Sequence, residues 1–125
     1  MKGTIAFLGR EYKVKKPPQF AVREELVIAY GEAEGNTSRN LRVCAAVLGI
    51  CSEIGLEAKA DYVKARFDVL AYGGAVYGYL RQSGAQPAEV IAEATQLIME
   101  LTNEVFPREG EVAARAGFSS PAPAE

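Results

Sequence analysis

The chain has 125 residues, a length typical of one domain, and 49% of its residues are hydrophobic while 24% are charged. Its formal net charge is −2 and it has no histidine. It therefore has no bulk attraction for nucleic acid and lacks the commonest general base and metal ligand. No apolar run approaches the roughly 20 residues that span a bilayer, and the N-terminus lacks a cleavable signal pattern. We expect one cytosolic domain without a membrane segment.

The first strand of an expected β-hairpin is Thr4–Leu8, and Tyr12–Val14 begins the second with alternating apolar and basic residues. Gly9–Glu11 is the expected turn, and Pro17 and Pro18 end the second strand. A lone hairpin is marginal in water, so this one must lie on the helices or pair with another chain.

Four helices are expected after the hairpin. Gly35 suits the C-terminal cap of the first, Asn36–Ser38 form a capping cluster before the second, and Gly55 ends the second. The second helix is apolar on two faces, which predicts a central position, and Gly49 inside it indicates a close helix crossing. Pro107 ends the fourth helix. The expected helices cover about residues 20–34, 39–54, 59–82 and 87–106.

The predicted fold is therefore mainly α, a compact bundle of about four helices with a hairpin at about residues 1–18. A short fifth helix is expected at about 109–116, which closes a single domain of residues 1–116. Residues 117–125 are rich in Ser, Pro and Ala, a composition that predicts a flexible tail.

The expected third helix has Gly74 and Gly78 four residues apart on one face, with Tyr72 and Tyr77 beside them. Small residues at this spacing let a second helix approach closely. The same pattern has two interpretations: core packing in a helical bundle, or an aromatic-lined groove for a partner.

Charge is unevenly distributed along the chain. Residues 1–23 hold six cations and one Glu, a net charge of +5, whereas residues 89–125 hold seven Glu and two Arg, a net charge of −5. Either the two ends attract each other within one chain, or they support a basic binding face or head-to-tail self-association.

No catalytic residue or cofactor site emerges from the sequence, so a non-enzymatic protein is expected. Cys44 and Cys51 would lie about 10 Å apart along a helix, too far for a disulfide, and two thiols alone cannot hold structural zinc. The glutamates of the fourth helix fall opposite its apolar stripe and have no histidine partners for a di-metal site. Asp61 and Asp68, seven apart, have the spacing of a solvated helix face.

Binding residues are predicted in the hairpin, on the expected third helix and in the C-terminal segment. Tyr12 lies between cations, with Arg10 before it and Lys13 and Lys15 after it, which is the pattern of a small base-stacking patch, although we do not expect an acidic chain to bind nucleic acid. The hairpin suits strand addition and the C-terminal segment suits folding on a partner. The predicted partner-binding residues are Tyr12, Lys13, Lys15, Tyr72, Gly74, Tyr77, Gly78, Val112 and Phe118.

The layout resembles the tail assembly chaperones of long-tailed bacteriophages and prophages. The stretch "GTIAFLGREYKVKKP" is similar to their N-terminal strand pair with a Gly-x-x-Tyr-like turn, here Gly9 to Tyr12. The end "PREGEVAARAGFSSPAPAE" is similar to their Glu/Val cassette and polar Phe-Ser tail, here Glu111-Val112 and Phe118-Ser119.

The resemblance implies a cytoplasmic helical protein of the bacterial host that coats the tape-measure protein, recruits tail-tube subunits and is absent from the finished virion. It also implies a longer frameshifted product and possible homo-oligomers. Two alternatives remain open: another small phage component such as a head–tail connector or scaffold, and a helical regulator that binds nucleic acid through the basic hairpin.

Overall fold

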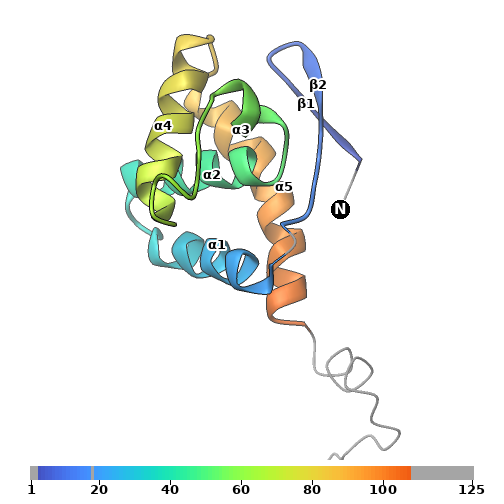
Figure 1. The fold of residues 1–125 in the computed structure, drawn as a ribbon, viewed down its shortest axis with the longest axis vertical. Coiled ribbons are helices and arrows are strands. Elements are labelled where there is room, and N and C mark those ends of the chain that lie inside the picture. The colour runs from blue at the N-terminus through green and yellow to red at the C-terminus, as the bar shows by residue number, and fades with distance from the viewer. Residues whose placement is uncertain (1–2, 18, 108–125) are drawn as a thin grey trace, which may run out of the picture.

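The computed structural model describes residues 3–17 and 19–107, and it is mainly α-helical with an N-terminal β-hairpin, as the sequence predicts. The expected short helix at 109–116 and the tail at 117–125 lie outside the described residues. Figure 1 shows the elements in chain order: β1 (Thr4–Phe7), β2 (Arg10–Lys13), α1 (Phe20–Glu32), α2 (Thr37–Ile50), α3 (Ile54–Glu57), α4 (Val69–Gln82) and α5 (Pro87–Val105).

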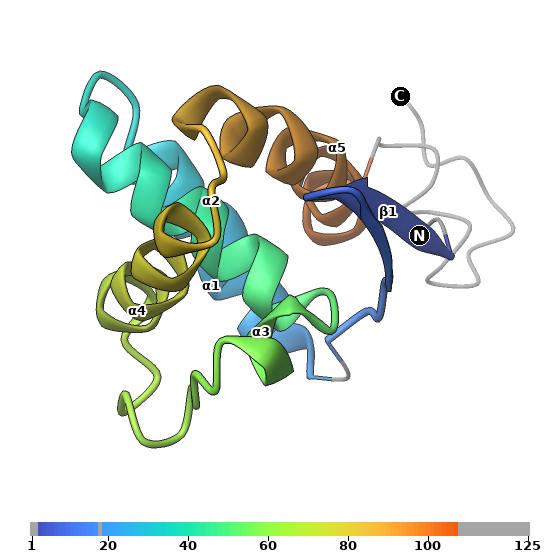
Figure 2. The ribbon, with the colours of Figure 1, turned by 90° about the horizontal axis from the view of Figure 1, so that it is seen from above.

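Helix α2 occupies the centre of the bundle. Every residue from Val43 to Gly49 is buried, and α4, α5, α1 and α3 all pack against the helix, with α4 and α5 on different sides of it (Figure 2). The helix begins after Asn36, whose side-chain oxygen accepts a hydrogen bond of 3.0 Å from the Arg39 amide. The prediction of a central helix is confirmed.

Helix α2 ends four residues earlier than expected, at Ile50 rather than at residue 54. Ser52 is fully buried and pairs with Val14 in an isolated antiparallel bridge. Its hydroxyl donates to the Leu48 carbonyl at 2.5 Å and accepts from the Ile54 amide at 3.2 Å. The prediction that Gly55 ends the second helix is wrong, because the chain leaves α2 to pair with the hairpin and Gly55 lies inside α3.

The predicted long helix at 59–82 is also wrong. Residues 58–68 form a loop in which Lys59, Arg66 and Phe67 have φ of +55° to +58°, and a right-handed helix cannot continue through left-handed residues. Helix α4 begins only at Val69, where the side chain of Asp68 caps it by accepting hydrogen bonds from the Leu70 and Ala71 amides at 3.0 and 3.1 Å.

Asp61 accepts from two amides of the 58–68 loop, those of Val63 and Lys64, at 2.9 and 3.1 Å. Asp61 and Asp68 therefore do not share the solvated helix face predicted for them. Each carboxylate satisfies backbone donors in a turn or at a helix start, which is the common local role of Asp outside helix interiors.

The close crossing of α4 and α2 occurs at Gly73. A Cβ at this position would collide with the Arg42 carbonyl of α2, whereas a Cβ at Gly74 or Gly78 would meet nothing within 4 Å. The buried face of α4 runs through positions 69, 72, 73, 76 and 80, which leaves Gly74 and Gly78 on another face. The expected close approach of a helix at Gly74 and Gly78 is wrong, while the close crossing expected at Gly49 is confirmed by its contact with Tyr72 and Val76 of α4.

The hairpin turn is shorter than expected. Leu8 and Gly9 have φ of 54° and 73°, the pattern of a two-residue type I′ turn, so Arg10 begins β2 and the predicted turn at Gly9–Glu11 is wrong. The register pairs Ile5 with Tyr12, and both side chains are buried. A shift of one residue would turn the apolar side chains to solvent, so burial selects this register even though it places Leu8 at positive φ.

The hairpin lies on the helices of its own chain. The Lys15 amide donates to the Cys51 carbonyl at 2.8 Å, and the Glu53 amide donates to the Lys13 carbonyl at 3.2 Å. β2 therefore continues into a short backbone pairing with the segment between α2 and α3, which anchors the hairpin to the bundle.

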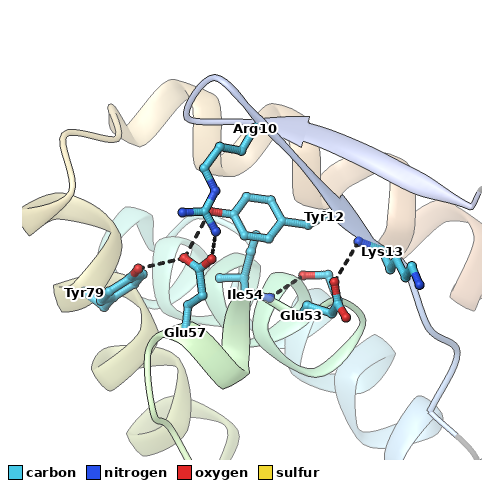
Figure 3. Close-up of polar contacts among 8 residues, drawn as sticks. Arg10, Tyr12, Lys13, Glu53, Ile54, Glu57 and Tyr79 are labelled. Carbon is cyan, nitrogen blue, oxygen red and sulfur yellow. Dashed lines mark hydrogen bonds and ion pairs between the residues drawn. The ribbon is translucent and has the colours of Figure 1, made fainter.

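Glu57 of α3 fixes the position of the hairpin (Figure 3). Its Oε1 accepts hydrogen bonds from the hydroxyls of Tyr12 at 3.2 Å and of Tyr79 at 2.8 Å, and its Oε2 forms an ion pair with Arg10. One carboxylate thus joins β2, α3 and α4.

Helix α5 has the boundaries and the apolar stripe that the sequence predicts. Gln86 and Glu89 form a capping box before Pro87 enters the first turn. Near the other end, Glu104 forms ion pairs with Lys16 at 2.9 Å and Arg23 at 3.5 Å. Cations of the N-terminal region therefore meet the acidic helix within one chain.

Candidate functional site

An apolar groove lies between α1 and the 58–68 loop, and we call it the α1 groove. Three cavities lie next to one another here, because the first shares the lining residues Val22 and Tyr62 with the second, and the second shares Glu25 and Phe67 with the third. The third cavity also includes Ile28. The series therefore follows α1 from its first turn to its last.

Large apolar side chains are exposed along this region. Phe67 is 53% exposed, Ile28 45% and Leu56 69%, and all three line the cavities. Val63, on the same loop, is 66% exposed. Exposed apolar side chains that gather beside a groove are typical of protein-interaction surfaces, whereas scattered ones are ordinary.

The aromatic wall of the groove is fixed by polar contacts and ring packing. The Tyr62 hydroxyl donates to Glu25 of α1 at 3.0 Å, and the Tyr62 ring packs edge-on against Phe67 and Tyr72 with centroids 5.3 and 5.5 Å apart. Burial and the Glu25 carboxylate raise the pKa of Tyr62, so this hydroxyl remains a donor at neutral pH. The left-handed backbone at Phe67 places its ring on this wall.

The groove has opposite charges at its two ends. Lys15 and Lys16 line the first cavity, while Glu25 and Glu32 line the third, beside Arg39. A segment with an apolar face, acidic at one end and basic at the other, would complement this distribution.

The predicted partner-binding residues do not form one site. Tyr12 is buried beneath the hairpin and so cannot stack on a base, while Lys13 and Lys15 are exposed. Val112 and Phe118 lie outside the described residues.

The predicted Tyr/Gly surface on α4 is divided between two faces of the helix. Tyr72 is buried and lines the first cavity, and Tyr77 is partly buried against the core. Gly74 and Gly78 lie on the outer face and line none of the three cavities.

Sequence reasoning missed Phe67, Ile28 and Leu56 as surface residues. The spacing of Phe67 fits an apolar stripe of the helix expected at 59–82. The signal that separates it from α4 is Asp68, the capping residue directly after it. Nothing in the local sequence marks Ile28 or Leu56, because their exposure depends on what the tertiary structure leaves uncovered.

The basic hairpin holds fewer unpaired cations than its sequence indicates. Arg10 pairs with Glu57, and Lys16 pairs with Glu104. Because these cations are already neutralised, the hairpin presents a weaker positive potential to the phosphates of a nucleic acid.

Comparisons with protein-family models, curated proteins and solved structures give no significant match. Over residues 3–17 and 19–107, no group of three or more acidic or thiol side chains is arranged to hold a metal ion. Within the same part of the chain, no helix is long and apolar enough to cross a membrane.

Proposed function

We propose that this protein is a non-enzymatic tail assembly chaperone of a long-tailed bacteriophage or prophage, which holds an apolar helical segment of the tape-measure protein in the α1 groove. The observation that carries the proposal is the row of adjacent cavities along α1 with Phe67, Ile28 and Leu56 exposed on it. The resemblance of the chain's layout to this chaperone family supplies the identity of the client.

A groove between a helix and a loop suits an amphipathic helix, which lays its apolar face on exposed side chains of this kind. A tape-measure protein offers many such segments, and several chaperone copies along one client would bind more tightly than one. Recruitment of tail-tube subunits is part of the same proposal and requires a second surface.

The proposal is tested by affinity purification of the tagged full-length chain from cells that assemble phage particles, with bound proteins identified by mass spectrometry. We expect recovery of a very long helical protein and the tail-tube subunit, with no bait in finished particles. Recovery of portal or capsid proteins, with bait in particles, would instead favour a head–tail connector.

A matched pair of variants assigns the binding to the groove. Phe67→Asn removes the exposed ring, and Asn tolerates the positive φ at this position better than other polar residues. Met99→Gln changes a comparably exposed apolar side chain on α5, which lines none of the three cavities. Equal client recovery by both variants would refute the groove as the binding surface.

A further inference from the structure

A pocket at one end of the α1 groove has features of a small-ligand site. We call it the Tyr72 pocket; its volume is about 290 Å³ and its apolar walls include Val22, Ile50 and Leu56. An engineered cavity of about 150 Å³ accommodates benzene. The Tyr72 pocket therefore has room for an aromatic ring or an alkyl chain of medium length with a short polar end.

The Tyr72 hydroxyl is an unused hydrogen-bonding group at this pocket. Tyr72 is 4% exposed, and its hydroxyl makes no hydrogen bond to any residue that the structure describes. Gly49 and Gly55, which also line the pocket, leave the space that this hydroxyl occupies, because a Cβ on either would lie 2.6 Å from its oxygen. The hydroxyl is not one of the fully buried polar atoms that lack a partner, so it has some access to solvent, and a ligand in the pocket can reach it.

A cation without an ion pair lines the same pocket. Lys15 is exposed, and its ammonium forms neither a hydrogen bond nor an ion pair with the described residues, whereas the neighbouring Lys16 is paired with Glu104. Lys15 and Tyr72 thus line one cavity, where a single ligand can contact both.

We infer that the Tyr72 pocket binds a small apolar carboxylate, such as a medium-chain fatty acid or an aryl-alkanoate. The chain or ring of the ligand lies against the apolar walls, while the carboxylate accepts a hydrogen bond from Tyr72 and pairs with Lys15. Because burial raises the pKa of Tyr72 to about 12, the hydroxyl is a neutral donor at pH 7. The Tyr72 pocket is the first of the three cavities of the α1 groove, but the inference does not rest on the proposed chaperone function.

The test is titration of the ¹⁵N-labelled full-length chain with octanoate, followed by amide NMR. We expect saturable shifts that are largest at Gly49, Ile50 and Gly55, with octan-1-ol binding more weakly because it lacks the charge. Lys15→Gln removes an exposed charge and should weaken octanoate binding roughly fivefold. Tyr72→Phe removes one hydrogen bond and should weaken it by a similar factor, about fivefold.

The control is Lys13→Gln, which removes a neighbouring exposed lysine that does not line the pocket and should leave octanoate affinity unchanged. Thermal unfolding of each variant checks whether the fold is retained. Absence of saturable shifts would overturn the inference. It would also be overturned if octanoate and octan-1-ol bound equally well and Lys15→Gln had no effect, since that result indicates apolar partition without recognition of the carboxylate.

Discussion

Gly73 of α4 lies directly against the carbonyl oxygen of Arg42 in α2, with no room for a Cβ between the two helices. This contact sets the distance of closest approach between the two elements of the bundle that share the most extensive interface. Gly74, the next residue, has open space where its Cβ would be. Two adjacent glycines of one helix therefore have different roles.

We predict that Gly73→Ala destabilises the protein by about 2–3 kcal/mol, because the added methyl group must push the backbones of α4 and α2 apart. Gly74→Ala should instead stabilise α4 by up to about 1 kcal/mol, since Ala is the better helix former and meets no neighbour. Urea unfolding of both variants measures the difference. If Gly74→Ala lowered the free energy of unfolding as much as Gly73→Ala, the outer face of α4 would have to be packed against something in solution.

Glu57→Ala is predicted to loosen the hairpin. The change leaves the hydroxyls of Tyr12 and Tyr79 without their acceptor and Arg10 without its ion-pair partner. The hydrogen bonds account for most of the expected loss of about 1–2 kcal/mol, because the Arg10 side chain is 59% exposed and its ion pair contributes little. The free energy of unfolding and amide hydrogen exchange in β2 measure the effect.

The control for this variant is Glu53→Ala, which removes only an exposed contact of 3.4 Å to the Lys13 amide. It should change stability by less than about 0.5 kcal/mol. Hairpin amides that exchange at the same rate in both variants would contradict the role assigned to Glu57.

Glu104→Gln is predicted to destabilise the contact between the N-terminal region and α5. The Arg23 side chain is only 15% exposed and loses the charge that it faces, so we expect a loss of about 1–3 kcal/mol. Glu93→Gln is the control, because Glu93 lies on the same helix without an ion pair among the described residues. Urea unfolding at low and high salt should show a smaller difference at high salt; equal stability of the two variants would refute the prediction.

Stability is predicted to fall above about pH 9 because of the two buried thiols. Burial raises the pKa of Cys44 from 9.0 to about 11 and that of Cys51 to about 12. The unfolded chain therefore releases these protons first, so their stabilising contribution is complete below pH 9 and is lost as the pH rises toward the folded values. Between its unfolded-state pKa and its folded-state pKa, each thiol lowers the free energy of unfolding by on the order of 1 kcal/mol per pH unit.

Urea midpoints measured from pH 8 to 10.5 check this prediction, and a Cys44→Ala variant should lose stability less steeply with pH. At pH 8 both thiols of the folded protein should react with a thiol reagent much more slowly than in denaturant, because the thiolate is the reactive form. Rapid modification of the native protein would show that the thiols are accessible.

The sequence alone was enough for the mainly α fold, the hairpin, the central position of α2 and the full extent of α5. These features depend on local signals that tertiary packing reinforces. The alternating strand has a buried face, Asn36 caps α2, and α5 has both a capping box and an unbroken apolar stripe. Where capping, propensity and periodicity agree, a prediction from sequence is dependable.

The tertiary structure decided where α2 ends, where α4 begins and which surface remains uncovered. Ser52 leaves the helix to pair with Val14, a residue 38 positions away, and no local pattern contains that pairing. Phe67 fits a helical stripe by spacing, yet its left-handed backbone places it on the α1 groove. The candidate site is thus defined by exposure, which depends on all the elements that pack together, whereas periodicity reports only which residues share a face.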